Sequence, residues 1–596
     1  MRFGRISKAV GVAAIAALAM SACSSTSSAP SGTSSASGAQ SGGTATVVEV
    51  NAFSSFNSNT AKGNVDINSK IAYATHADFN YVDNQLNIVK NEKFGKYEKV
   101  SDDPLTIKYT INEGVKWSDG SPVDANDLIL AWAAMSGHYD SAKFDADGKI
   151  TAGTQYFAYA GDTSGLGLTD FPEIGADGRS ITLKYSKPYA DWEIAFNMYN
   201  NMPAHVLATK AGLKDAKALT DMLKALPKGN PDVPAAPNAQ LKKVADFWNT
   251  GFDTKTMPTD PALALSTGPY VVKSVVPDQS MTLTRNKDYN WGPVPKLDEI
   301  TIRYISSAPA QIQALKNGEA DIIAPQASAD TVEQLQALQS QGVTLDKGPQ
   351  LSYDHLDLNY SGVFKDKNVR EAFMKTVPRK DIVDKIIKKL NPDAAPLDSQ
   401  IFLPAQSKYA ETVKNNGSAN FQDVDIAGAK KLLNGATPTV KIMYNKENPN
   451  RIDAYTLIAQ SAAKAGFKIV DDGLGASVWG GVLGNGTYDA TIFGWISPGV
   501  GVSSVPQIFR TGGASNFNKF SSPEADKLMG DLILTTDKAK QDDLEAQIDK
   551  LIWASDYGLP LFQTVGVDAY SDRVTGVKYN PTSTGVWWNF WEWSQK

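Results

Sequence analysis

Cysteine is nearly absent from the sequence, because the 596 residues contain a single one, Cys23. An intramolecular disulfide is therefore excluded, and a folded body of this length has to be stabilised by a large hydrophobic core. Histidine is also scarce, and the four histidines show none of the spacings that zinc sites use. After Cys23, no apolar run approaches the roughly 18 residues that a membrane-spanning helix requires.

Basic clusters and catalytic motifs are missing as well. The chain has 58 Lys and Arg residues against 64 Asp and Glu, a formal net charge of -6, which argues against nucleic acid as a partner. There is no G-x-S-x-G elbow, no phosphate-binding loop and no H-E-x-x-H segment, and nothing in the sequence points to a cofactor or a metal. A pair of catalytic carboxylates needs no sequence motif, so the absence of motifs leaves an exported hydrolase as one possible class of protein.

Residues 1–22 are predicted to form an export signal. A basic start at residues 2–8 precedes an uncharged run at 9–22 that ends in small side chains. The next residue is the lone cysteine, and Met20-Ser21-Ala22-Cys23 resembles the lipobox of bacterial lipoproteins. That resemblance implies a diacylglycerol on the sulfur of Cys23. The alternative is an ordinary secretory signal in which the cysteine is incidental.

Residues 23–45 are predicted to be a flexible linker. Apart from Cys23, Pro30 and Gln40, the segment consists of Ser, Thr, Gly and Ala, which cannot form a core. Two acyl chains on one thiol hold a protein stably on a membrane. We therefore expect an extracytoplasmic protein that a lipid anchors to the outer face of the cell membrane.

Strand and helix patterns alternate through the rest of the chain and indicate an α/β fold. Asp124 is placed to cap a helix whose apolar face contains Leu128, Trp132 and Met135. An amphipathic helix is expected at 380–390. Strands are predicted at 44–50, 104–111, 174–187 (a hairpin), 268–286 (two strands), 297–305, 320–323, 439–445, 466–473 and 487–495.

Seven segments of the chain, all in the same order, carry a family resemblance. They are EGVKWSDGSPVDANDLILAW (113–132), STGPYVV (266–272), LTRNKDYNWG (283–292), IQALKNGEADI (312–322), NVREAFMKTVPRKDIV (368–383), YDATIFGW (488–495) and KFSSPEADKLM (519–529). Together they resemble the family 5 extracellular solute-binding proteins, the dipeptide- and oligopeptide-binding receptors of ABC importers. The similarity runs from about residue 46 to the C-terminus.

The resemblance implies a two-lobed periplasmic-binding-protein-like clamp with an additional inserted α+β domain. Lobe I would combine residues 46–75, 190–325 and 566–596, and the inserted domain would span 76–189. Lobe II would span 326–565. Such receptors close their lobes around a ligand by hinge motion.

The resemblance also implies a ligand site between the lobes. Trp495, at the end of a strand, matches the family's cleft-lining strand, although a buried core Trp is the alternative. Backbone groups beside it would bond an extended ligand as an added strand does. Surface or structural roles stay open for the other candidates. The expected ligand-binding residues are Asn64, Val65, Asp66, His355, Tyr444, Asn445, Gly494, Trp495, Ile496, Ser497 and Arg510.

One departure concerns the ligand's amino group. Peptide-binding members place an Asp two or three residues after the cleft Trp, to pair with the α-amino group. Here residues 496–500 are Ile-Ser-Pro-Gly-Val, and the next acidic residue is Glu524. A buried ammonium requires a partner, and Asp66 on the opposite wall is one candidate.

The sequence therefore predicts a monomeric, lipid-tethered receptor rather than an enzyme. It would capture oligopeptides outside the cell and deliver them to an ABC permease. An oligosaccharide or other polar solute is the alternative ligand, and a scaffold lipoprotein without transport is the third class. Trp117, Asp119 and Gly120 are interpreted as structural, a packed Trp beside a turn.

Overall fold

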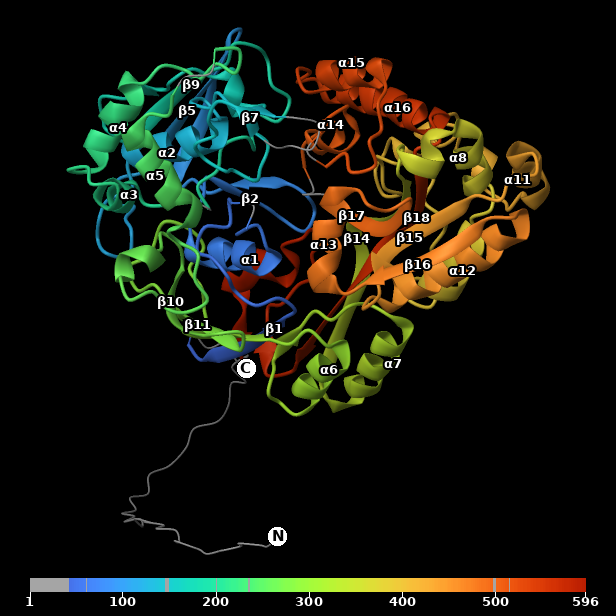
Figure 1. Ribbon diagram of the computed structural model, residues 1–596. Coiled ribbons are helices and arrows are strands. Elements are labelled where there is room, and N and C mark those ends of the chain that lie inside the picture. Colours follow the sequence, from blue (N-terminus) through green and yellow to red (C-terminus); the bar gives the residue numbers. More distant parts are fainter. Residues whose placement is uncertain are drawn as a thin grey trace, which may run out of the picture. The chain divides into compact units, whose positions relative to one another are not determined.

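The computed structural model describes residues 42–60, 62–144, 150–199, 201–233, 236–496, 500–513 and 515–596 (Figure 1). The export signal, Cys23, most of the linker and Ser497 lie outside the described residues. Within these ranges, no helix is both long enough and apolar enough to cross a membrane.

A mixed ten-stranded sheet dominates the part of the chain that the structure describes. Strands β1, β12 and β13 are parallel to one another, as are β15, β16 and β17. With helices on its faces, this sheet confirms the predicted α/β class. In order, its strands are β10 (Tyr270–Val276), β11 (Ser280–Arg285), β12 (Glu299–Tyr304), β1 (Thr44–Glu49), β13 (Ile322–Ile323), β18 (Gly558–Ser571), β14 (Val343–Leu358), β17 (Ala490–Ile496), β15 (Thr439–Asn445) and β16 (Lys468–Leu474).

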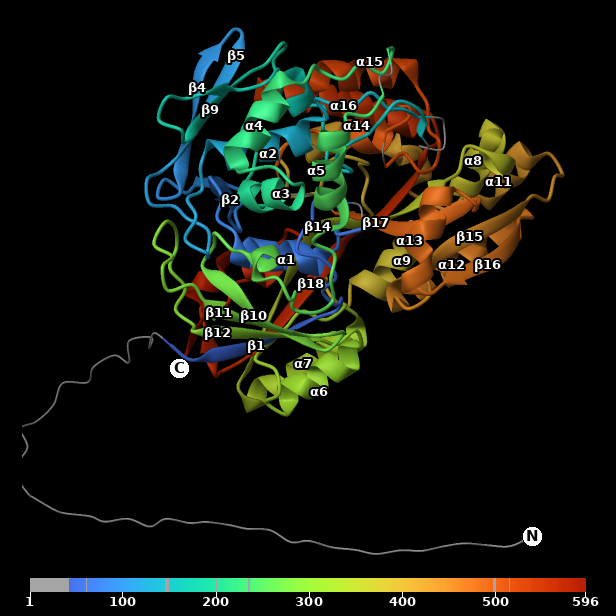
Figure 2. The ribbon, with the colours of Figure 1, turned by 60° about the vertical axis from the view of Figure 1, so that its left-hand side comes forward.

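Two long strands, β14 and β18, join the halves of this sheet (Figures 1 and 2). They pair antiparallel from Val343 opposite Ser571 to Asp357 opposite Gly558, and the register shifts between Pro349 and Tyr353. At one end β18 pairs with β13, and further along β14 pairs with β17. The same two strands therefore contribute to both halves.

A second sheet has its own core. Its strands, in order, are β4 (Gly95–Asp102), β5 (Leu105–Ile111), β9 (Ser180–Lys184) and β8 (Glu173–Ile174). The side chains of Ile107 and Tyr109 on β5 are fully buried, as their alternation predicts. The same core takes in helices α3 (Ala204–Lys210), α4 (Ala216–Ala225) and α5 (Ala239–Thr250), which the sequence assigned to lobe I. Packing thus groups 204–250 with this sheet, and the lobe limits stay a prediction.

Helix α2 (Ala125–Ser136) starts as the sequence predicts. The Asp124 carboxylate accepts the backbone N–H of Asn126 at 2.8 Å, and the Asp124 N–H donates to Asp127 at 3.1 Å. Asp127 also accepts the indole N–H of Trp117, which is 1% exposed. Trp117 is therefore structural, and it helps to fix the start of the helix.

Helices cover both faces of the ten-stranded sheet. On one face of the β14–β17–β15 half, Phe373 and Ile458 from the helices pack with Leu356, Ile442 and Ile492 from the strands. Another core lies among α14, α15 and α16. The helices are α1 (Asp66–Thr75), α6 (Ala308–Lys316), α7 (Ala329–Leu338), α8 (Lys367–Met374), α9 (Arg379–Ile382), α10 (Tyr409–Thr412), α11 (Ile426–Leu433), α12 (Pro449–Ala465), α13 (Ala476–Asn485), α14 (Ser504–Phe509), α15 (Pro523–Leu532) and α16 (Lys538–Ala554).

The helix expected at 380–390 is interrupted. α9 is followed by a π-helical turn at Val383–Ile387, where the backbone bonding changes from i−4 to i−5. The three apolar residues that predicted one face, Ile382, Ile386 and Leu390, are nevertheless buried. The apolar spacing correctly predicted which side of the segment is buried, but it did not predict the change from α-helix to π-helical turn.

The C-terminal tail packs against the first strand. Its 3₁₀ segment η7 (Gly585–Glu592) places Trp587 and Phe590 in one core with Val47 of β1, and Trp593 joins them. The Trp587 indole donates to Glu49, the last residue of β1, at 2.7 Å. The two ends of the described chain therefore complete one core. The short strands are β2 (Asn80–Val82), β3 (Ile88–Lys90), β6 (Lys143–Phe144), β7 (Ile150–Ala152), β19 (Val574–Thr575) and β20 (Ser594–Gln595).

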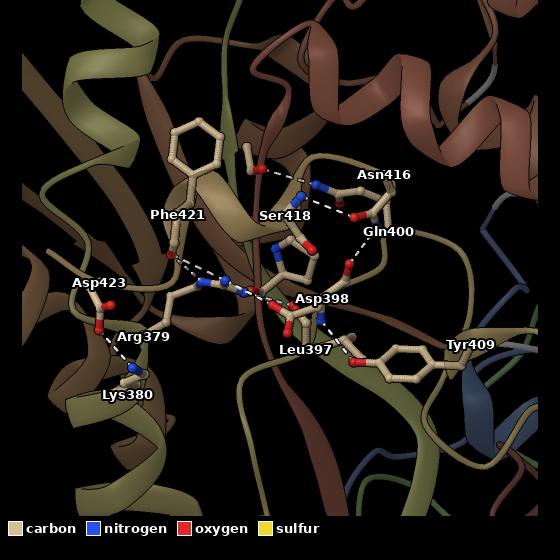
Figure 3. A network of polar contacts seen from close by, with 12 residues as sticks. Arg379, Lys380, Leu397, Asp398, Gln400, Tyr409, Asn416, Ser418, Phe421 and Asp423 are labelled. Atoms are coloured by element: carbon tan, nitrogen blue, oxygen red, sulfur yellow. Dashed lines mark hydrogen bonds and ion pairs between the residues drawn. The ribbon is translucent and has the colours of Figure 1, made fainter. Parts of the chain in front are cut away.

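Arg379 organises a buried polar network beside β18 (Figure 3). Its guanidinium donates to the Leu397 carbonyl at 2.8 Å, to the Phe421 carbonyl and to the Pro560 carbonyl at 3.3 Å. It also pairs with the Asp398 carboxylate at 2.9 Å. One side chain thus fastens the connection between α9 and α11 to a central strand.

The pH dependence of stability follows from buried carboxyl groups. Burial raises their pKa to about 6 or 7, in Asp78, Asp127, Asp140, Glu545, Asp549, Asp556 and Asp568. The folded state then holds protons that the unfolded chain releases above pH ~4, so the free energy of unfolding falls as pH rises to ~7. We expect the thermal unfolding midpoint to be about 3 °C or more higher at pH 5.5 than at pH 8.

Two histidines act in the opposite direction. Burial lowers the pKa of His76 to about 4 and also lowers that of His138, which favours the folded state at higher pH. The two histidines are fewer than the seven carboxyl groups, so the carboxyl groups decide whether the free energy of unfolding rises or falls with pH. A midpoint that is higher at pH 8 would contradict this prediction, and differential scanning calorimetry at both pH values measures it.

Candidate functional site

A cavity of about 540 Å³ lies between α1, the β2–β3 hairpin and the C-terminal segment. Asn64 and Asp66, two of the predicted ligand-binding residues, line it at the start of α1. Val500 lines it from the other half of the chain. Its volume falls in the range of about 300–1,000 Å³ that small-molecule sites occupy.

Aromatic side chains form one wall of the cavity. The Tyr81 and Trp591 rings meet edge to face, with centroids 5.1 Å apart, and Tyr73 lies 6.2 Å from Trp591. The Tyr73 hydroxyl donates to the Trp588 carbonyl at 3.0 Å, which fixes the ring. Tyr289 lines the cavity as well. Rigid rings of this kind favour stacking with apolar or cationic groups of a ligand.

The charges on α1 are already paired. Lys70 contacts Glu49 at 2.6 Å and Asp66 at 3.7 Å, and Asp66 also accepts a hydrogen bond from Asn51 at 2.7 Å. Burial lowers the pKa of Lys70, but Glu49 and Asp66 outweigh that effect and raise it above its ordinary value. Lys70 is therefore charged at neutral pH, whereas His76, which lines the same cavity, is neutral.

Asp78 is a carboxylate in this cavity that the sequence analysis did not single out. Its Oδ1 accepts the backbone N–H of Phe79 at 2.7 Å and that of Met198 at 2.9 Å. Burial raises the pKa of Asp78 to about 7 in spite of these hydrogen bonds. No basic side chain in the described ranges forms an ion pair with it.

Asp191 holds the segment that leads into α14. Its carboxylate accepts the N–H of Val502 at 2.9 Å and that of Ser503 at 2.9 Å, and Asp191 is 6% exposed. Gly501 allows the close approach, because a Cβ there would lie 2.7 Å from Asp191 Oδ2. Since Val500 lines the cavity, this contact positions part of the cavity wall.

A second, smaller cavity of about 180 Å³ lies beside β14, β18 and the start of α12. Arg451 bonds Asp354 with two nitrogens, at 3.0 and 2.9 Å, and both residues line the cavity. Gly494 lines it too, where a Cβ would lie 2.6 Å from Asp354. The predicted residue Gly494 is thus at a place where only hydrogen fits.

Trp495 and His355 belong to an aromatic stack. The half-buried Trp495 ring stacks between Phe517, with centroids 5.9 Å apart, and His355, at 5.7 Å. His355 is 1% exposed, and its Nδ1 lies 2.7 Å from the Asp357 carboxylate. Neither residue lines the two cavities above. His355 has packing partners on β14 and β17 rather than an open position.

The remaining predicted residues are not gathered at the larger cavity. Tyr444 is buried against the Tyr455 ring, with centroids 4.8 Å apart. Asn445 accepts the backbone N–H of Glu447, and Arg510 is exposed at the end of α14. Val65 packs into the core as the residue before α1. Ser497 and the Ile496 side chain lie outside what the structure describes.

Sequence reasoning missed the side chains that depend on distant neighbours. Asp78, Tyr81 and Asp191 lie in segments without a motif. Only the fold brings Asp78 and Tyr81 to the cavity and Asp191 to the segment that follows Val500. The C-terminal sequence clusters five aromatic residues at 587–593, a pattern that indicates packing but does not say which ring lines a cavity. The structure shows that Trp591 lines the cavity, while Trp587 and Trp593 fill the core.

The two joined halves of the sheet, the second sheet and the 540 Å³ cavity define a class, the two-lobed periplasmic binding proteins. The family description "Bacterial extracellular solute-binding proteins, family 5 Middle" matches residues 92–517. The chain belongs to this family, whose members are solute-binding receptors of ABC importers rather than enzymes. This confirms the resemblance that the seven segments indicated.

Curated relatives are found in mycobacteria. The chain is 27% identical over 497 residues to the oligopeptide-binding protein OppA of Mycobacterium tuberculosis, which covers 81% of this chain and 73% of OppA. It is 26% identical over 565 residues to an uncharacterized lipoprotein of Mycobacterium leprae, with 91% of this chain and 92% of that one covered.

Solved structures share the fold. The periplasmic EDTA-binding protein EppA matches with a TM-score of 0.78 and 22% identity, covering 94% of this chain and 97% of EppA. The oligopeptide-binding protein AppA from Bacillus subtilis, solved with a nonapeptide, matches with a TM-score of 0.71 and 19% identity, covering 94% of this chain and all of AppA. These similarities confirm the predicted two-lobed clamp.

Proposed function

We propose that the protein is a lipid-anchored receptor that captures oligopeptides outside the cell and delivers them to an ABC permease. The observation that carries this proposal is the 540 Å³ cavity, which aromatic rings, paired charges and Val500 line. The similarity to OppA supports a peptide as the ligand. The receptor would act as a monomer.

The proposed ligand contacts lie in two parts of the molecule. Asn64 and Asp66 face the cavity, and Val65 would contribute its backbone. The backbone from Gly494, which lines the smaller cavity, to Ser497 would bond an extended peptide, with the Trp495 ring beside it. His355, Tyr444, Asn445 and Arg510 would contact the ligand only after a change in the packing described above.

The anchor is proposed to be a lipid on Cys23, with residues 23–45 as the tether. Relatives that are described as lipoproteins support this part of the proposal. A flexible chain of this length has an r.m.s. span of roughly 26 Å, which allows the receptor to reach a permease in the same membrane. The protein would then lie on the outer face of the cell membrane.

Native mass spectrometry of the full chain, purified gently in mild detergent, tests the proposed function. We expect a set of short peptides to be released from the protein and a mass shift that corresponds to a lipid on Cys23. A single non-peptide solute would contradict the peptide assignment. An empty protein that binds neither peptides nor sugars in a thermal-shift assay would contradict the receptor role.

A further inference from the structure

We propose that Asp78 and the aromatic rings around it form a pocket for a positively charged group of the solute. The inference rests on the proposed receptor function and adds the chemical class of its ligand. An ammonium or a guanidinium group fits, and a peptide supplies these at its amino terminus or on a Lys or Arg side chain.

The first argument is charge balance in the cavity. Lys70 is the partner of Glu49 and Asp66, and His76 is neutral at physiological pH. Asp78 has backbone N–H groups at its Oδ1, but no ion pair to a basic side chain within the described ranges. A desolvated carboxylate without a counter-charge favours the entry of a cation, because a cation removes the penalty of its burial.

The second argument is the set of rings beside the carboxylate. Tyr73, Tyr81, Tyr289 and Trp591 line the same cavity as Asp78. The Tyr81 and Trp591 rings meet edge to face with centroids 5.1 Å apart, and the Tyr73 ring lies 6.2 Å from Trp591, so the rings form a continuous aromatic surface. Aromatic faces attract cations, and the attraction is stronger in a site from which water is excluded.

The third argument concerns the missing Asp after Trp495. Asp66, the substitute that the sequence suggested, already pairs with Lys70 and Asn51. Asp78 lies in the same cavity and is not committed to a cation. The structure therefore offers a different place for the ligand's charge, on the wall that α1 and β2 form rather than beside Trp495.

Calorimetry with the full chain in detergent tests the pocket. The probes are the tetrapeptides Ala-Lys-Ala-Ala and Ala-norleucine-Ala-Ala, each with a free or an acetylated amino terminus. We expect removal of one of the two charges to weaken binding tenfold or more. If acetylation weakens binding, the amino terminus is the bound cation. If norleucine in place of Lys weakens binding, the Lys side chain is the bound cation.

Asp78→Asn is expected to abolish this preference, so that the charged and uncharged probes bind within about twofold of each other. The amide oxygen can still accept the Phe79 and Met198 N–H groups, which preserves the backbone. Asp140→Asn is the matched control. Asp140 is also a carboxyl whose pKa burial raises, and it accepts the Tyr156 N–H at 2.8 Å, but it lines neither cavity.

The outcomes separate the two proposals. If the unmodified protein binds all four peptides equally, or if Asp78→Asn keeps the preference, the pocket is wrong and the receptor proposal stands. The comparison of the four peptides on the unmodified protein needs no variant, so it tests the preference for a positive charge even if Asp78→Asn does not fold. If no peptide binds at all, the peptide-receptor proposal fails together with the pocket.

Discussion

Asp191→Ala is expected to weaken solute binding by tenfold to a hundredfold while the protein still folds. The Asp191 carboxylate is the acceptor for two backbone N–H groups, at Val502 and Ser503, that lie more than 300 residues further along the chain. Hydrogen bonds to a charged group contribute about 1.5–3 kcal/mol, and about 1.4 kcal/mol corresponds to tenfold in affinity. Without them, Val500 loses its fixed place at the cavity, and bound solute dissociates faster.

Calorimetry with the tightest-binding tetrapeptide measures the effect, and stopped-flow tryptophan fluorescence measures the dissociation rate. Asp191→Asn keeps an acceptor oxygen, so we expect its affinity to lie between those of the unmodified protein and Asp191→Ala. Asp170→Ala is the control, because this carboxylate is 90% exposed and, within the described residues, forms an ion pair with Lys228 alone. Unchanged affinity in Asp191→Ala, with a lower unfolding midpoint, would mean that the contact is purely structural.

Arg379→Ala is expected to lower the thermal unfolding midpoint by about 3 °C. The variant leaves the carbonyls of Leu397, Phe421 and Pro560 without their buried donor, and Asp398 without its charged partner. Removal of one member of such a pair destabilises by roughly 3–5 kcal/mol when both are buried, and Asp398 is partly exposed, so we expect the lower end.

The neighbouring residue supplies the control. Lys380 pairs with Asp423 at 2.7 Å, but both side chains are exposed, at 56% and 80% (Figure 3). An exposed pair contributes at most about 1 kcal/mol, so Lys380→Ala is expected to change the midpoint little. Equal midpoints for Arg379→Ala and Lys380→Ala in scanning calorimetry would show that the buried network is dispensable.

Local patterns predicted most of the elements. The cap at Asp124 and the strands at 104–111, 439–445 and 466–473 depend on neighbours within a few residues, and the structure confirms them. The π-helical turn after α9 was not predicted, because the spacing of Ile382, Ile386 and Leu390 fits an uninterrupted α-helix equally well.

The candidate site was less predictable. Asn64 and Asp66 were placed at the cavity because family resemblance gave their loop a role. Asp78 and Asp191 could not be found in this way, because a carboxylate becomes informative only when its burial and its partners are known. His355 illustrates the converse, since a polar residue in a promising strand is buried against Asp357 and Trp495.

The union of β1 with the C-terminal tail has a consequence for the order of folding. β1 pairs with β12, some 250 residues later, and its core also needs Phe590 and Trp593 near the last residue. Contacts of such long range form late, because the intervening chain has to be ordered first. This part of the molecule therefore cannot complete its core until Trp593 has been synthesised. The proposed export of the protein would benefit from such a delay, because an incompletely folded polypeptide can still pass through a translocation channel.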